Sequence, residues 1–391
     1  MANHPGERAV LDAASTPMHP VARDTLMAAV DAGWADPRRL YAEGRTARRL
    51  LDQAVEVLAA GLRVRPSELS FAPSGPAAVR LAVDGALHAG RRRGSRLVAT
   101  AVEHSAVLAP GRHRAAQVGD ERLFAEVPVD ATGRVDLAAL AEAVGVAGTA
   151  AAAVQHANGE VGTLQPLGPS HGVCRAAGIP LVVDAQASLG RVGSPASYDV
   201  LAGDAQSWGG PGGLGVLAVP ERTRWSLPGP AGEPGLGRSG HTPWVPLALA
   251  AAEAWQQAEA TREEEERQAR ALVDLVRAAA AAVPDVEVVG HPTDRLPHIV
   301  TFSALYVDGE ALVHEFDRRG FAIASGSACT ASTLEPSHVL AAMGALTHGN
   351  VRITLPLASV SPRRALDVER FCAALPEVVL DVRAQLGAEH L

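Results

Sequence analysis

This sequence of 391 residues contains no lysine. All 35 residues counted as Lys+Arg are arginines. The lysine amine is the side-chain group that forms Schiff bases with carbonyl compounds, so this chemistry is excluded for every side chain. Aromatic residues are also scarce, at 4% of the chain, whereas 47% of the residues are hydrophobic and 20% are charged. This composition is typical of a folded globular protein and argues against intrinsic disorder.

Cysteine is the other scarce residue, with only Cys174, Cys329 and Cys372. Their spacing fits neither a disulfide framework nor a metal site, so we expect no metal and a reducing compartment. A net charge of −8 argues against a nucleic-acid-binding face. The first residues, "MANHPGERAVLDAAS", lack the apolar segment of a signal peptide. We therefore expect a cytoplasmic location, with neither nucleic acid nor a membrane as partner.

Short apolar runs alternate with helical patterns along the first part of the chain. The runs that predict strands lie at 68–73, 95–105, 151–160 and 179–188, and the amphipathic stretches at 45–61, 76–89, 136–145 and 168–177. Further strands are predicted near 286–289, 298–304 and 321–324. The pattern predicts an α/β fold, with a mainly parallel sheet sandwiched by helices and a smaller C-terminal α/β domain. We expect a large domain over 15–245 and a small domain formed by 1–14 and 246–391.

Two segments lie on either side of the expected domain boundary at residue 245. Residues 225–243 are rich in Gly and Pro and predict a long loop. A long helix is expected from about 245 to 283, and its "REEEERQAR" segment is interpreted as a solvated face with i,i+4 ion pairs.

Cys329 lies in "FAIASGSACTASTLE", among small residues that contribute little to a hydrophobic core. It is either a small buried residue or a thiol on a mobile loop, and the surrounding glycine and serines favour the loop. Cys174 and Cys372 lie in helical patterns, and we expect both to be packed.

Several segments together resemble the cysteine desulfurases, in the class V aminotransferase branch of the pyridoxal-phosphate (fold type I) enzymes. In order they are "VLDAASTPMHP", "TAVEHSAVL", "VQHANGEVGTLQPL", "LVVDAQASLG", "GGPGGLGVL", "GRSGHTP", "ASGSACTASTLEPSHVLAAMG" and "GNVRITL". The resemblance spans roughly residues 10–365. It implies a large domain that holds the cofactor, a two-fold homodimer in which His241 and its "GRSGHTP" loop cross to the neighbouring site, and a sulfur-acceptor protein as partner.

The resemblance also assigns roles to five residues. Cys329 matches the loop cysteine that takes sulfur from free cysteine as a persulfide, and His104 matches the histidine that stacks on the cofactor ring and moves protons. Asp184 matches the carboxylate that pairs with the pyridinium nitrogen, and its place at the end of an apolar run agrees with this role. Asn158 matches a residue near the phenolic oxygen, although it also suits a turn before a glycine. Arg352 matches the arginine that binds the substrate carboxylate.

The cofactor's covalent anchor departs from the family pattern. The family has a His-Lys pair before "GGPGGLG", and this chain has Gln206 and Ser207. A serine hydroxyl cannot form an aldimine, and the chain has no lysine elsewhere that could replace it.

The phosphate-binding positions depart as well. A Gly-Ala-Thr segment at a helix start is replaced by Ser74, Gly75 and Pro76, which removes one backbone N–H and one hydroxyl. Asp204 replaces a serine and would place negative charge beside a phosphate dianion, and His241 replaces a threonine. A glutamine expected at position 187 is also missing, although Gln186 precedes that position.

Two hypotheses follow. In the first, the protein serves sulfur transfer as a partner, scaffold or persulfide relay, with Cys329 accepting sulfur but without conventional desulfurase turnover. In the second, it is an enzyme that acts on cysteine or a related amino acid, with pyridoxal phosphate or another ligand bound noncovalently.

Overall fold

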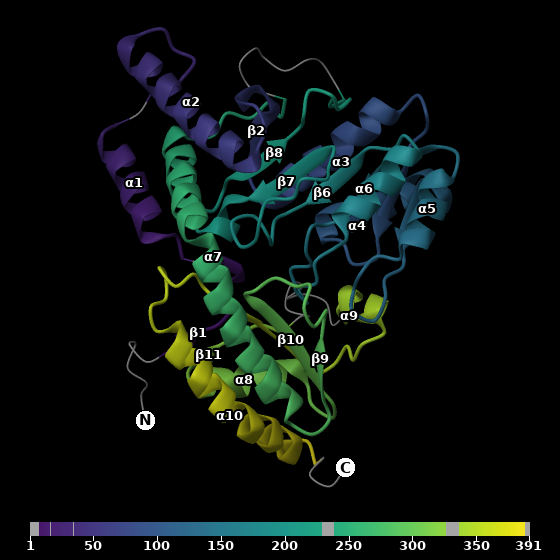
Figure 1. The fold of residues 1–391 in the computed structure, drawn as a ribbon, viewed down its shortest axis with the longest axis vertical. Coiled ribbons are helices and arrows are strands. Elements are labelled where there is room, and N and C mark those ends of the chain that lie inside the picture. Colours follow the sequence, from purple (N-terminus) through teal and green to yellow (C-terminus); the bar gives the residue numbers. More distant parts are fainter. Residues whose placement is uncertain (1–7, 16, 34, 229–237, 326–335, 388–391) are drawn as a thin grey trace.

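The main sheet has seven strands, in the order β2-β8-β7-β6-β5-β3-β4 (Figure 1). The computed structural model describes residues 8–15, 17–33, 35–228, 238–325 and 336–387. The strands are β2 Leu69–Ala72, β3 Arg96–Thr100, β4 Phe124–Val127, β5 Thr149–Ala153, β6 Leu181–Asp184, β7 Val200–Asp204 and β8 Gly215–Ala218. The five strands from β7 to β4 pair in parallel, and β8 pairs antiparallel with both β7 and β2. The predicted mainly parallel sheet is therefore confirmed.

Helices cover both faces of this sheet because successive strand residues point to opposite sides. Val98 and Val183 belong to the core that also contains residues of α1, α2, α5 and α6, whereas Leu97 and Val182 pack with α3 and α4. The helices are α1 Pro20–Asp31, α2 Ala42–Leu62, α3 Gly75–Gly90, α4 Ser105–Val118, α5 Leu137–Gly145 and α6 Leu167–Ala176. The sequence therefore predicted the sandwich correctly.

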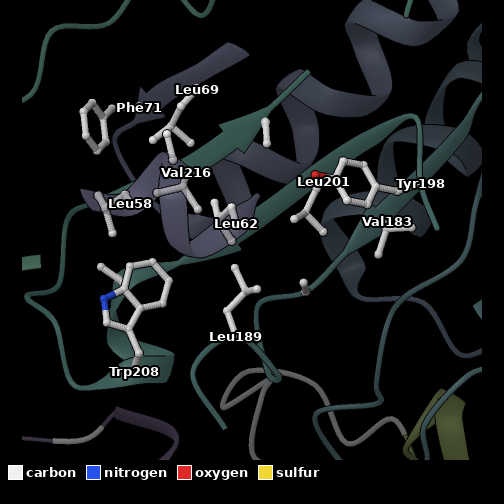
Figure 2. Close-up of a cluster of buried hydrophobic side chains, with 14 of the residues drawn as sticks. Leu58, Leu62, Leu69, Phe71, Val183, Leu189, Tyr198, Leu201, Trp208 and Val216 are labelled. Atoms are coloured by element: carbon white, nitrogen blue, oxygen red, sulfur yellow. The ribbon is translucent and has the colours of Figure 1, made fainter. Parts of the chain in front are cut away.

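Part of the first core fixes the short 3-10 helix η4, Ala205–Trp208, which carries two of the predicted cofactor residues. Trp208 is fully buried beside Leu58, Leu62 and Leu189 (Figure 2). Its ring meets that of Trp255 edge-on, with centroids 5.0 Å apart, and its Nε1 donates to the Ala251 carbonyl oxygen at 3.0 Å. The segment that bears Gln206 and Ser207 is thus anchored by its last residue.

The C-terminal part builds a second core around a three-stranded antiparallel sheet with β10 in the middle. Its elements are β9 Val286–Val289, β10 Ile299–Ala304, α8 Gly309–Arg318, β12 Asn350–Thr354 and α10 Arg364–Gln385. β1, Ala9–Val10, joins it from the N-terminal end by pairing in parallel with β11, Phe321–Ala322. A short helix, α9 His338–Met343, packs against a separate cluster. Within the described residues, no helix combines the length and apolar character needed to span a bilayer.

The helix α7, Val245–Ala281, takes part in both cores. Ala248 to Ala258 contribute to the first core and Ala269 to Ala280 contribute to the second. Figure 1 shows α7 running from the large sheet down to the small one. The domain division at residue 245 stays a prediction, because the helix belongs to both sides.

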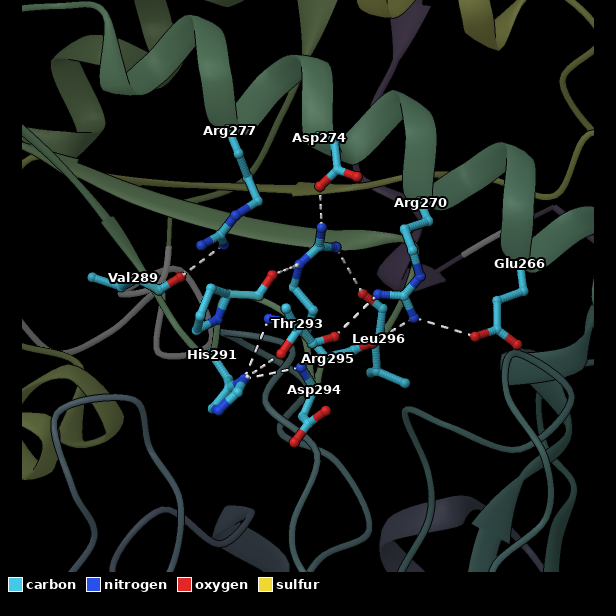
Figure 3. A network of polar contacts seen from close by, with 11 residues as sticks. Glu266, Arg270, Asp274, Arg277, Val289, His291, Thr293, Asp294, Arg295 and Leu296 are labelled. Atoms are coloured by element: carbon cyan, nitrogen blue, oxygen red, sulfur yellow. Dashed lines mark hydrogen bonds and ion pairs between the residues drawn. The ribbon is translucent and has the colours of Figure 1, made fainter.

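The C-terminal half of α7 holds the loop between β9 and β10 by a set of arginine contacts (Figure 3). Arg270 donates to the Thr293 and Arg295 carbonyl oxygens at 3.2 Å, and Arg277 donates to the Val289 carbonyl oxygen at 3.2 Å. The same loop contacts the segment between β5 and α6, because the Leu164 N–H donates to the Asp294 carbonyl oxygen at 2.9 Å. These contacts fix the segment that follows β5 at the edge of the site.

The interpretation of "REEEERQAR" as a solvated face is wrong at one position. Glu263, Glu264 and Arg267 are exposed as expected, but Glu265 is only 9% exposed. Glu265 forms an ion pair with Arg364 of α10 and accepts a hydrogen bond from the Ala358 N–H at 3.2 Å. Glu265 is buried because α10 packs against α7. This contact between distant segments could not be predicted from the local sequence pattern.

Candidate functional site

Three predicted site residues follow the carboxyl ends of strands in the main sheet. His104 comes after β3, while Asp184 and Asp204 are the last residues of β6 and β7. Parallel strands deliver their ends to one edge, where ligands of such sheets bind. The structure therefore brings together residues that are up to 100 positions apart in sequence.

Asp184 is buried, and both of its oxygens are engaged by one neighbour. The Gln186 N–H donates to Oδ1 at 2.9 Å and the Gln186 side-chain amide donates to Oδ2 at 2.8 Å. Burial raises the pKa of Asp184, nearby His104 and the two hydrogen bonds oppose that rise, and Asp204 adds to it. His104 therefore lies within electrostatic reach of Asp184, and the predicted roles of both residues toward a cofactor ring stay predictions.

His104 is exposed and begins helix α4 as its N-cap. Its Nδ1 accepts a hydrogen bond from the Ala106 N–H at 3.0 Å. This bond fixes the ring's orientation and leaves Nε2 as the other nitrogen that can hold or release a proton.

The N-terminus of α3 carries a carboxylate from the chain itself. Ser74 caps the helix, with its Oγ accepting from the Ala77 N–H at 3.2 Å. The Gly75 N–H donates to Asp204 Oδ2 at 2.7 Å, and the Gln206 N–H donates to Asp204 Oδ1 at 2.9 Å. Burial raises the pKa of Asp204, while these two backbone hydrogen bonds lower it.

Ser207, which the family resemblance aligns with the lysine, directs its hydroxyl to the backbone. Its Oγ lies 2.8 Å from the Asp204 carbonyl oxygen and 3.0 Å from that of Leu189. Its own carbonyl oxygen accepts from Arg191 Nε at 2.6 Å. The side chain thus closes the turn of η4.

Asn158 is buried and both ends of its amide are engaged. Its Oδ1 accepts from the Glu160 and Val161 N–H groups at 2.8 and 2.9 Å, and its Nδ2 donates to the Val102 carbonyl oxygen at 3.1 Å. This arrangement matches the turn interpretation of Asn158, and the predicted contact with a cofactor ring stays a prediction.

Arg352 is 9% exposed and lies in β12 beside the start of the cysteine loop. Its N–H donates to the Ala324 carbonyl oxygen at 2.7 Å. Its guanidinium lies 3.7 Å from Asp12, and its Nε has no hydrogen-bond partner among the described residues. A buried guanidinium with free donor capacity suits a carboxylate ligand. Cys329 itself lies outside the described residues.

The other sequence-predicted residues lie as follows. His241 is half-buried, its N–H donates to Ser239 Oγ at 3.3 Å, and burial lowers its pKa. Its crossing to a second subunit stays a prediction. Cys174 is fully buried in α6 and Cys372 is half-buried in α10, which confirms that both are packed.

Two carboxyl groups near the site were missed, the buried Glu103 and the half-buried Glu160. Glu103 precedes His104; burial raises its pKa to about 8, opposed by hydrogen bonds from Thr100 and Gln155. Burial likewise raises the pKa of Glu160 to about 7, opposed by Ser337 and Arg352. The available signal for Glu103 was its place at the end of an apolar strand, the same signal that identified Asp184.

The family resemblance implies pyridoxal phosphate, and the residues around α3 do not fit its phosphate. The Gly75 N–H, which would face a phosphate at this helix start, donates to the Asp204 carboxylate instead. The position of the covalent anchor is held by Ser207, whose hydroxyl is engaged with the backbone.

Comparison with known proteins gives one consistent result. The aminotransferase class-V family profile matches residues 10–361. The chain is 36% identical over 388 residues to an IscS-like cysteine desulfurase of Mycobacterium tuberculosis, covering 95% of this chain and 96% of that protein. It is 31% identical over 358 residues to a cysteine desulfurase, IscS 1, of Archaeoglobus fulgidus, covering 90% and 91%. A solved NifS-like protein superposes with a TM-score of 0.83 at 21% identity, covering 95% of this chain and 99% of that one, and confirms the fold.

Proposed function

The chain belongs to the class-V aminotransferase family, among its cysteine desulfurase members, and from that premise we propose that it relays sulfur without generating it. In this proposal Cys329 accepts a sulfur atom and passes it to an acceptor protein. The chain does not cleave the C–S bond of free cysteine, because that cleavage in this family depends on a cofactor held by a lysine.

One observation carries the proposal: the hydroxyl of Ser207, which the family resemblance aligns with the lysine, bonds the backbone at 2.8 and 3.0 Å. The whole sequence has no lysine that could take over, and a second copy of the same chain would bring none. Neither subunit of the expected homodimer could therefore supply the amine.

The sulfur must then arrive already activated, as a persulfide R–S–SH. The Cys329 thiolate attacks the terminal sulfur, a new S–S bond forms, the donor's S–S bond breaks, and R–S⁻ leaves. The product is Cys329–S–SH, and the exchange involves no net oxidation or reduction. A relay of this kind needs no electron sink, which is consistent with the altered cofactor anchors.

The second hypothesis is favoured by Arg352 alone. Its buried guanidinium has a donor without a partner among the described residues, so a carboxylate ligand such as an amino acid has a binding group ready. An enzyme acting on cysteine with a noncovalent ligand would use this group. Pyridoxal phosphate that remains in stoichiometric amount after extensive dialysis would support this second function.

The test compares free cysteine with a small-molecule persulfide, such as glutathione persulfide, as sulfur source. We expect no alanine from cysteine, and the mass increase of one sulfur atom on Cys329 from the persulfide. The increase should disappear in Cys329→Ser and persist in Cys372→Ser, a matched control. Steady release of alanine and sulfide from cysteine by the wild-type protein would overturn the proposal.

A further inference from the structure

We propose that Asp204 and Gln186 fill the cofactor's two noncovalent anchor points from within the chain, so that the pocket rejects phosphate-bearing ligands. The Asp204 carboxylate acts as an anion that the chain itself places at the N-terminus of α3. Gln186 donates hydrogen bonds to both carboxylate oxygens of Asp184. This inference deepens the proposed function and rests on its premise that the chain forms no aldimine.

The Asp204 contacts are those that an anion makes at a helix start. One carboxylate oxygen accepts the Gly75 N–H at 2.7 Å and the other accepts the Gln206 N–H at 2.9 Å. The first N–H groups of a helix have no intrahelical partner, and the helix dipole favours negative charge there. Pro76 has no N–H, so the first turn has one fewer donor to offer a second anion. Pro76 thus leaves fewer N–H groups at this helix start for binding an anion, and Asp204 accepts the hydrogen bond of one that remains, the Gly75 N–H.

Space at the same point is limited as well. A methyl group added at Gly75 would lie 2.5 Å from the Gln186 side-chain oxygen and 2.6 Å from Asp204 Oδ2. Both side chains therefore lie directly over the Gly75 backbone, where a phosphate would have to approach. A dianion placed there would meet the Asp204 carboxylate at hydrogen-bonding range, where like charges repel strongly.

The second anchor is filled in the same manner. Asp184 would pair with a pyridinium nitrogen, but both of its oxygens accept hydrogen bonds from Gln186, at 2.8 and 2.9 Å. A ring nitrogen would have to compete with the side-chain amide for the carboxylate. The two substitutions thus act on the two ends of one ligand: Asp204 on the phosphate and Gln186 on the ring.

The experiment measures binding of inorganic phosphate, pyridoxal phosphate and pyridoxal by isothermal titration calorimetry. The test variants are Asp204→Ser and Asp204→Asn, and the matched control is Asp199→Asn, just before the start of the same strand. The Asp199 carboxylate likewise accepts a backbone hydrogen bond, from the Leu181 N–H at 2.9 Å, so the control makes the same change of charge at the opposite end of β7.

We expect both Asp204 variants to bind inorganic phosphate and pyridoxal phosphate at least about ten-fold more tightly than the wild type. Their affinity for pyridoxal, which has no phosphate, should change little. Asp199→Asn should behave as the wild type. Gln186→Ala should instead improve the binding of pyridoxal.

Two further measurements keep the test decisive. If the Asp204 variants lose stability, millimolar phosphate should raise their melting temperatures and leave that of the wild type unchanged, since the anion then replaces the lost carboxylate. In the wild type itself, pyridoxal phosphate should bind no more tightly than pyridoxal. Micromolar binding of pyridoxal phosphate to the wild type, in competition with inorganic phosphate, overturns the proposal, as do folded Asp204 variants with unchanged phosphate affinity. None of these measurements involves Cys329, so a failure here is distinct from a failure of the sulfur relay.

Discussion

Replacing Glu265 by alanine should destabilise the protein far more than an equivalent change one residue earlier. Glu265 and Arg364 form an ion pair whose side chains are only 10% and 4% exposed. The buried Arg191 also depends on this charge: burial lowers the pKa of Arg191 to about 10, and the charge of Glu265 opposes that fall. Glu265→Ala therefore leaves two buried guanidinium groups without their carboxylate.

The expected loss follows from the cost of an uncompensated buried charge. Removing one member of a buried pair costs roughly 3–5 kcal/mol. At about 2–4 °C per kcal/mol for a chain with large domains, the melting temperature should fall by roughly 6–20 °C. The control is Glu264→Ala on the same helix, because the Glu264–Arg267 pair is exposed at 48% and 71% and is worth at most about 1 kcal/mol.

The assay is thermal unfolding followed by circular dichroism, with the midpoint as readout because a chain with two cores need not unfold in one step. Glu265→Gln, which keeps the shape and loses the charge, should lie between the two alanine variants. Equal midpoints for Glu265→Ala and Glu264→Ala would refute the reasoning, since they would mean that the buried pair contributes no more than an exposed one.

Three further predictions use other parts of the structure. Cys329 should be alkylated first by iodoacetamide near pH 8, because burial raises the pKa of Cys174 to about 12 and raises that of Cys372; equal protection of Cys329 and Cys372 would contradict this. Because the pKa of Glu103 is raised to about 8, the folded state keeps a proton that the unfolded state releases. The free energy of unfolding should therefore fall between about pH 5 and 8, by up to about 1.4 kcal/mol per pH unit. Glu103→Gln should flatten this fall in urea titrations at several pH values, and an unchanged slope would show that Glu103 is ionised when folded. The protein should sediment as a dimer at micromolar concentration, and a monomer alone would count against the expected two-fold assembly.

The sequence predicted the parts of the fold with strong local patterns. β6 was identified because "IPLVVD" is continuously apolar and ends in a carboxylate, and α7 was identified from its length. β4, β7 and β8 were missed: β4 is half exposed, and β7 and β8 are apolar runs of only five and four residues with glycine at or near their ends. Short strands of this kind are stabilised by their neighbours in the sheet, and their own sequence carries little signal.

The site was predictable only where one residue carried the signal. His104 and Asp184 were each identified from the resemblance, and Asp204 was singled out as unfavourable for phosphate. The hydrogen bond that gives Asp204 its place runs to Gly75, 129 positions away, and no local pattern relates the two. Gln186 was noted only as a glutamine one position before the glutamine expected from the family. Its contact with Asp184 depends on the backbone turn that follows β6.

The shared helix α7 limits how this protein can be divided or recombined. With 37 residues it is about 55 Å long, and it contributes buried side chains to both hydrophobic cores. A fragment that ends near residue 245 would expose the apolar surface that Ala248 and Trp255 cover, and the complementary fragment would carry those same side chains into water. Exchange of the C-terminal part with a homologue therefore has to bring the entire helix together with both surfaces that it contacts. A gene fusion or a split reporter is better placed at an exposed loop of one core than at the boundary between the two.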